Sequence, residues 1–358
     1  MIDLVIAGVG NIGLPFVDFV ARMPGVRSVV LIDPEIFTGS NVFCQMVGLR
    51  NVGHSKVDVA AGRIAEANPA LRIETLACRL EHAPRGLYRG RIIVSCLDSR
   101  IARALLSDIA SMVGALLWLD AGVRPEGRLA RVSAAFPSQA QAAGICCGWG
   151  PQDWNLAASE YSCAGAFAGT PSRSPAFLGA TAASVMAHLL DRFIANDLPP
   201  SADVQSWVFS LNAHRSWTTS IRRSSDCRCK HQSWDIEPLG RSAETCKLSS
   251  LTEAGSLAVV GMPIARSLRC HCGSVRSSFH IAARRPEAIV HCDSCGGKMS
   301  SGALDLIDEI DLSALEDFGP EVPALALADL GVSNGDIVRL GDRHFEVGVS
   351  VLSQEGRA

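Results

Sequence analysis

The segment that decides the fold is residues 3–13, Asp-Leu-Val-Ile-Ala-Gly-Val-Gly-Asn-Ile-Gly. Its first five residues are apolar enough for a short strand, and residues 14–23 carry an apolar face suited to a helix. Between them, Gly8, Gly10 and Gly13 form a turn that offers backbone N–H groups and a helix N-terminus to a phosphate. The segment therefore predicts the opening unit of a Rossmann-like, doubly wound α/β sheet.

A second apolar strand is expected over residues 29–32, and it ends at Asp33. An acidic residue about 20 positions after the glycine turn holds the ribose hydroxyls of a dinucleotide or of ATP. The pattern thus favours a nucleotide site. The alternative is a tight packing turn that binds no ligand.

Polar residues downstream distinguish an ATP site from an NAD site. Asn41, Gln45 and Lys56 follow Asp33 closely in the sequence. A hydride-transfer site has no need for these groups beside the phosphates. An adenylating site does, because charge builds on the α-phosphorus and on the departing pyrophosphate. The spacing therefore favours ATP.

This block resembles the ubiquitin-activating and ThiF–MoeB-type adenylyltransferases, whose pattern runs Asp-x-Asp, Ser-Asn-Leu-x-Arg-Gln, Gly-x-x-Lys. The resemblance covers roughly residues 1–230 and implies a sheet of the activating-enzyme type. It implies that Asp33 holds the ribose of ATP. It also implies that Asn41, Gln45 and Lys56 face the triphosphate.

Two residues depart from the family pattern. Glu35, which we still assign to the nucleotide, stands where the family usually has Asp, and Cys44 stands where it has Arg. One cation that would face the phosphates is therefore missing. Arg50 or Arg103 compensates for it, or a partner chain supplies the charge, or catalysis is slower.

A third strand is expected over residues 91–95 and leads to Asp98. By the resemblance, Asp98 positions Mg²⁺ and Arg103 lies near the phosphates. One well-placed carboxylate with phosphate oxygens suits Mg²⁺. The alternative role for Asp98 is an N-cap for a helix over residues 100–112, and both roles can hold at once. Asp120 closes a further strand at the same edge of the sheet.

Composition and charge limit the number of domains and the kinds of partner to be expected. The chain has 358 residues, 48% of them hydrophobic, and a net charge of −3. We expect an adenylation domain over residues 1–250, which includes a crossover cysteine segment, and a zinc-containing module over residues 251–358. The charge indicates no nucleic-acid partner. Neither a signal peptide nor a membrane-spanning run is expected, which predicts a cytoplasmic protein.

The 13 cysteines suggest metal more than disulfides in a reducing compartment. Two close pairs about 20 residues apart have the spacing of a tetrahedral zinc site. The four predicted ligands are Cys270, Cys272, Cys292 and Cys295. The alternative is four unrelated buried cysteines.

Cys227 and Cys229 follow an expected hairpin, at a point where relatives often place a cysteine pair that binds metal with an upstream pair. The resemblance implies Cys147 as their partner. The usual Cys-x-x-Cys spacing is broken here, with Gly144 at the first position. A second zinc and a metal-free packing role for these cysteines stay open.

Cys163 is followed by small residues, Ala-Gly-Ala. In the family, the equivalent segment heads the crossover and carries the sulfur that receives the activated carbonyl. A thiol on a mobile loop suits such a transfer. The alternative is a small buried cysteine.

The resemblance implies that the chain adenylates the C-terminal carboxylate of a ubiquitin-like protein, forms a thioester on Cys163 and passes it to a conjugating-type enzyme. A homodimer is the default, and a bacterial conjugation pathway in antiviral defence is one setting. Alternatives are a sulfur-carrier adenylyltransferase and a non-catalytic partner subunit. An NAD-dependent oxidoreductase is less favoured, because no catalytic acid or base stands out.

Overall fold

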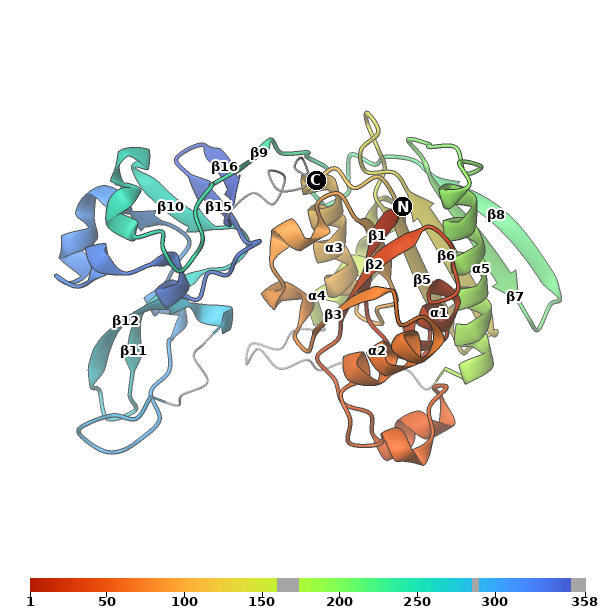
Figure 1. Cartoon of the computed structure of the whole chain (residues 1–358), viewed down its shortest axis with the longest axis horizontal. Helices are drawn as coiled ribbons and strands as arrows, with labels where there is room; N and C mark the ends of the chain where they lie inside the picture. The colour runs from red at the N-terminus through yellow and green to blue at the C-terminus, as the bar shows by residue number, and fades with distance from the viewer. Residues whose placement is uncertain (160–173, 285–289, 349–358) are drawn as a thin grey trace. The chain divides into compact units, whose positions relative to one another are not determined.

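The computed structural model describes residues 1–159, 174–284 and 290–348 (Figure 1). The chain forms two compact units. The first unit contains Met1–Ala83 and Tyr88–Ser233, and the second contains Pro84–Leu87 and the chain from Trp234 onward. The sequence predicts a boundary near residue 250, whereas the structure divides after Ser233. Residues 234–250 contribute a strand and a 3₁₀ turn to the second unit.

The first unit is built on one sheet of eight strands in the order β3-β2-β1-β4-β5-β6-β7-β8. Five strands run parallel, and each of the last three, β6, β7 and β8, is antiparallel to the strand before it. The predicted α/β sheet is confirmed, with an antiparallel extension. The strands are β1 Ile2–Ala7, β2 Val26–Ile32, β3 Arg72–Leu76, β4 Ile92–Ser95, β5 Trp118–Arg124, β6 Leu129–Ala135, β7 Val204–Ser210 and β8 Arg215–Ile221.

Five α-helices accompany this sheet: α1 Gly13–Val20, α2 Lys56–Ala67, α3 Arg100–Met112, α4 Pro151–Ser159 and α5 Ala176–Ile194. Helices α1, α2 and α5 share the main apolar core with the sheet, and Phe16, Ile64 and Met186 lie fully buried in it. Helix α3 packs against α4 and contributes Ala104 to a separate buried cluster. The carboxyl ends of β1, β2 and β4 are thereby held rigidly at one edge.

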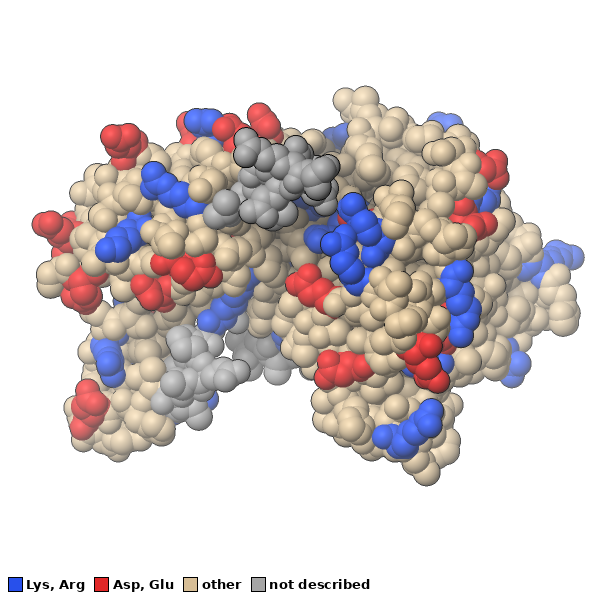
Figure 2. Space-filling view, in the orientation of Figure 1, with Lys and Arg blue, Asp and Glu red and all other residues tan. Residues whose placement is uncertain are grey.

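Among the described residues, α5 is long and apolar enough to cross a membrane by length and composition. The sequence predicts no such run. A core helix meets the same two criteria, and α5 has eight buried residues in its contacts with the sheet and α1. On the face shown in Figure 2, basic and acidic side chains are interspersed and form no continuous basic stripe.

The second unit contains two small sheets, ordered β14-β10-β15-β16-β9 and β12-β11-β13. Leu257, Ile264 and Leu327 are fully buried in its core. Its strands are β9 Ile236–Pro238, β10 Ser256–Val259, β11 Ile264–Arg269, β12 Val275–Ile281, β13 Leu306–Ile307, β14 Ile310–Asp311, β15 Ile337–Leu340 and β16 Arg343–Glu346.

A short piece of the β3–β4 connection belongs to this second unit. The Gly86 amide donates a hydrogen bond of 2.7 Å to the Gly335 carbonyl. A Cβ atom on Gly86 would lie 2.5 Å from that carbonyl oxygen and 2.8 Å from Glu346 Oε1. Only glycine fits without a shift of the backbone.

We therefore expect Gly86→Ala to lower the free energy of unfolding of the second unit by about 1–3 kcal/mol, because the added methyl group meets a backbone oxygen. Hydrogen exchange followed by mass spectrometry should show faster exchange in β15 and β16. Gly62→Ala is the control, since its Cβ has nothing within 4 Å and the helix gains propensity. Equal exchange in Gly86→Ala and wild type would contradict this account.

Candidate nucleotide site and metal centres

A cavity of about 660 Å³ lies in the first unit. Its walls come from the residues that follow β1, β2 and β4 and from the β5–β6 hairpin. In open α/β sheets, ligands bind at the carboxyl ends of the strands. The volume is in the range of small-molecule and cofactor sites.

The glycine turn forms the floor of this cavity. Gly8 has φ +87°, and a Cβ there would lie 2.8 Å from the Cys96 carbonyl oxygen. A Cβ on Gly13 would lie 2.1 Å from the Gly8 carbonyl oxygen. A Cβ on Gly10 would lie 3.6 Å from the Gln45 side-chain amide, an ordinary contact. The turn therefore presents bare backbone to the cavity, as phosphate binding requires.

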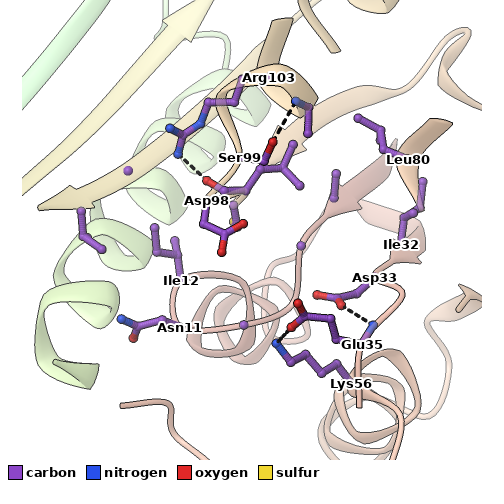
Figure 3. Close-up of a pocket in the computed structure, with 18 of the residues that line it drawn as sticks. Asn11, Ile12, Ile32, Asp33, Glu35, Lys56, Leu80, Asp98, Ser99 and Arg103 are labelled. Atoms are coloured by element: carbon purple, nitrogen blue, oxygen red, sulfur yellow. Dashed lines mark hydrogen bonds and ion pairs between the residues drawn. The ribbon is translucent and has the colours of Figure 1, made fainter. Parts of the chain in front are cut away.

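Asp33 is buried at the end of β2 and lines the cavity (Figure 3). Its two carboxylate oxygens accept hydrogen bonds of 2.9 Å from the backbone N–H groups of Val9 and Glu35. Burial raises the pKa of Asp33. The carboxylate thus ties the glycine turn to the end of β2.

Lys56 is the first residue of α2 and is only 4% exposed. Its Nζ lies 2.5 Å from Glu35 Oε2 and 5.7 Å from the centre of the Phe37 ring. Both members of the ion pair line the cavity, and the Glu35 side chain is 63% exposed. An entering phosphate would therefore compete with Glu35 for the lysine.

Of the two amide side chains predicted for the site, Gln45 lines the cavity and Asn41 does not. Gln45 lines the cavity, and its buried Oε1 has no hydrogen-bond partner among the described residues. Asn41 lies in a 3₁₀ helix, Gly39–Phe43, where its Oδ1 accepts a 2.8 Å bond from the Thr38 amide. Asn41 is not among the residues that line the cavity.

Asp98 follows β4 and lines the cavity on the side opposite Asp33 and Lys56 (Figure 3). The N-cap of α3 is Ser99, whose Oγ accepts a 3.2 Å bond from the Ala102 amide. Ser99 therefore provides the N-cap that was the alternative role for Asp98. The Asp98 carboxylate is left for other ligands.

Arg103 also lines the cavity, but the sheet holds its guanidinium. Nε donates a 3.1 Å hydrogen bond to Asp120, and Nη2 donates to the carbonyls of Leu97 and Ala121, the latter at 2.9 Å. Sequence reasoning missed Arg131, which lines the same cavity from β6. Cys44 and Arg50 do not line it, and Cys163 lies outside the described residues.

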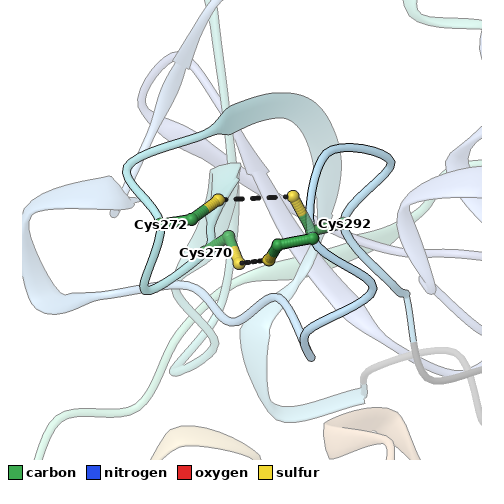
Figure 4. A group of neighbouring side chains, drawn as sticks. Cys270, Cys272 and Cys292 are labelled. Carbon is green, nitrogen blue, oxygen red and sulfur yellow. Dashed lines mark hydrogen bonds between the residues drawn. The ribbon is translucent and has the colours of Figure 1, made fainter.

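The four predicted zinc ligands converge in the second unit (Figure 4). The Cys270 and Cys295 sulfurs are 3.3 Å apart, and those of Cys272 and Cys292 are 3.6 Å apart. Hydrogen bonds from Ser274 lower the pKa of both Cys272 and Cys292. Four sulfurs gathered in one group fit tetrahedral zinc.

A second group of ligand atoms lies in the first unit. His231 Nε2 is 3.3 Å from the Cys147 sulfur and 3.1 Å from the Cys227 sulfur. Cys229 is not in this group, and its sulfur lies 3.7 Å from the Ala104 carbonyl oxygen. The predicted set of Cys147, Cys227 and Cys229 thus differs from the observed group by one member. Sequence reasoning missed His231, which the Cys-x-Cys-x-His spacing of residues 227–231 could have indicated.

Comparison with known proteins agrees with this geometry. The model of the ThiF family matches residues 2–273. The chain belongs to the ThiF family. The predicted resemblance to ThiF–MoeB-type proteins is confirmed at this level.

Two relatives carry the name adenylyltransferase and sulfurtransferase. The uba4 protein of Aspergillus niger is 33% identical over 131 residues, which cover 35% of this chain and 27% of the relative. UBA4 of Saccharomyces cerevisiae is 28% identical over 129 residues, which cover 35% and 29% of the two chains. The ThiF-family chain therefore spans less than a third of the length of these curated relatives.

Solved structures of Escherichia coli MccB share the fold. The complex with succinimide has a TM-score of 0.51 and 16% identity over 64% of this chain and 66% of that one. The complex with ATP has a TM-score of 0.51 and 17% identity over 63% and 65% of the chains. At these identities the likeness concerns the fold of the ThiF-family domain.

We expect the purified chain to contain zinc, and Cys292→Ser with Cys295→Ser to remove about one equivalent, because two of four thiolates are lost. His231→Ala should remove a second equivalent if Cys147 and Cys227 hold metal with it. Elemental analysis by mass spectrometry measures both. Cys78→Ser, outside both groups, is the control. Unchanged zinc in the double variant would contradict the assignment in the second unit.

Proposed function

We propose that the chain is an ATP-dependent adenylyltransferase that activates the C-terminal carboxylate of a ubiquitin-like or sulfur-carrier protein. The observation that carries the proposal is the convergence of the glycine turn, Asp33, Lys56 and Asp98 on one cavity. The names of the relatives and the MccB complex with ATP support it.

We assign Asp33 and Glu35 to the ribose and the glycine turn to the phosphates. The amides of Gly10 and Gly13 would meet the phosphates, whereas Gly8, whose amide donates to the Ile32 carbonyl at 2.8 Å, lets the turn pack closely on the end of β4. Lys56 and Gln45 then neutralise and orient the triphosphate, and Asn41 belongs to the same set only if its 3₁₀ segment moves toward the cavity. Binding of charged groups in fixed positions is how such sites lower the barrier to phosphoryl transfer.

We assign Asp98 to Mg²⁺, which would supply positive charge to the phosphate oxygens when bound. The carboxylate faces the cavity, and Ser99 already caps α3, so both observations favour this role. Arg103 lies beside it and supplies a fixed cation next to the reacting groups.

The acyl group would then pass to a sulfur. Cys163 is our proposed acceptor, and a conjugating-type enzyme the proposed recipient. A homodimer, a cytoplasmic location and a role in a bacterial antiviral conjugation pathway complete the proposal. Sulfur transfer for cofactor biosynthesis is the second candidate, and the sulfurtransferase in the names of the relatives favours it.

Lys56→Met should weaken ATP binding by about ten- to a hundredfold, because one charge-assisted hydrogen bond to a phosphate is lost. Methionine fills the buried site, and the exposed Glu35 needs no new partner, so the melting temperature should change little. Titration calorimetry with ATP and Mg²⁺ provides the measurement. Arg72→Met, an exposed change on β3, is the control, and equal affinity in wild type and Lys56→Met would count against the phosphate role.

ATP–pyrophosphate exchange should require a small carrier protein ending in Gly-Gly, and Asp98→Asn should lower the rate about a hundredfold or more through loss of charge stabilisation. Asp191→Asn, exposed on α5, is the control. Normal ATP binding with no exchange for any carrier would support a non-catalytic partner subunit instead.

A further inference from the structure

The cavity extends well past the residues assigned to the nucleotide. The nucleotide residues follow β1, β2 and β4, and residues 78–81, which follow β3, also line the cavity. The remaining wall belongs to β5, β6 and β7. We call this remaining wall the β5–β7 half of the cavity. It is lined by Gly122, Val123, Arg124, Leu129, Arg131 and Val208.

Arg131 is the charged group of interest in this half. It projects from β6, and its side chain is 37% exposed. Its Nη2 lies 3.7 Å from Asp120 Oδ2, which is longer than a hydrogen bond. Asp120 is fully buried, and its Oδ2 has no hydrogen-bond partner among the described residues. Asp120 thus attracts the Arg131 guanidinium without holding it by a hydrogen bond.

The other oxygen of Asp120 is already satisfied. Oδ1 accepts a 2.5 Å bond from Ser95 Oγ and a 3.1 Å bond from Arg103 Nε. One carboxylate therefore faces two guanidinium groups, and the three side chains carry a net positive charge. Because the fork of an arginine matches a carboxylate in shape and charge, the β5–β7 half is suited to a carboxylate ligand.

The sheet order gives the distance of this ligand from the reacting phosphate. Neighbouring strands lie about 4.8 Å apart, and β6 is two strands from β4 and three from β1. The backbone of Arg131 therefore lies about 10–14 Å from β4 and β1, whose ends carry the nucleotide residues. An extended peptide rises about 3.3 Å per residue. About three to four residues span about 10–14 Å, so a tail whose last carboxylate reaches the α-phosphorus would bring its third or fourth residue from the end near Arg131.

We propose that Arg131 is a specificity residue that binds an acidic side chain at the third position from the C-terminus of the adenylated protein. This inference rests on the proposed function, because it takes the second substrate to be a peptide tail. Asp120 is the positioning residue, since it draws the guanidinium toward the wall and leaves its remaining donors to the tail.

The test uses two fluorescein-labelled hexapeptides, Ala-Ala-Ala-Glu-Gly-Gly and Ala-Ala-Ala-Gln-Gly-Gly. Fluorescence anisotropy measures their binding to the full chain with Mg²⁺ and a non-hydrolysable ATP analogue. We expect the glutamate peptide to bind about tenfold more tightly than the glutamine peptide, with the difference shrinking at high salt. Arg131→Gln should abolish the difference, and Arg131→Lys should retain part of it.

Arg215→Gln is the matched control, since it removes the same charge from the exposed start of β8. No preference in wild type, no binding of either peptide, or a preference that survives in Arg131→Gln would each overturn the inference. Binding needs no turnover, so the readout is separate from ATP–pyrophosphate exchange. Exchange with a carrier but no glutamate preference defeats only this inference, whereas failure to bind ATP defeats the proposed function.

Discussion

The nucleotide site depends on the contact between the glycine turn and the end of β4. Gly8 approaches the Cys96 carbonyl, and Gly13 approaches the Gly8 carbonyl, so closely that no side chain fits at either position. This approach brings β1, β4 and the start of α1 together, and Gly8 and Gly10 line the cavity without side chains. The rest of the site is arranged around that bare backbone, since Asp33 fixes the turn through the Val9 amide.

Much of this arrangement could be predicted from sequence because it is local. The glycine turn, Asp33 and Asp98 each follow a strand directly, and parallel strands bring their ends to one edge. Gln45 and Lys56 follow Asp33 by 12 and 23 residues along the chain. The four cysteines of the second unit also sit in two close pairs, so a short loop suffices to bring each pair to the metal.

What could not be predicted depends on pairing between distant segments. Arg131 reaches the cavity because β6 lies antiparallel to β5, and its position opposite Gly122 follows from that register. His231 joins Cys147 across 84 residues. The division after Ser233 depends on residues 84–87 and 234–250 folding with the second unit, which composition does not reveal. Asn41 does not line the cavity, and its side chain caps its own 3₁₀ turn, which the family pattern does not reveal.

The charges that line the cavity explain how a site without the usual arginine still suits an anion. Lys56 is paired with Glu35, and Arg103 with Asp120, so the pairs offset much of the cost of burying these cations. The acidic partners of these two cations differ in their exposure. Glu35 is largely exposed and can release Lys56 to a phosphate with little loss, whereas Asp120 is fully buried and keeps Arg103 in place. One cation is therefore exchangeable and the other fixed, which suits the proposed reaction, in which a triphosphate binds first and a carboxylate is then held in line with it.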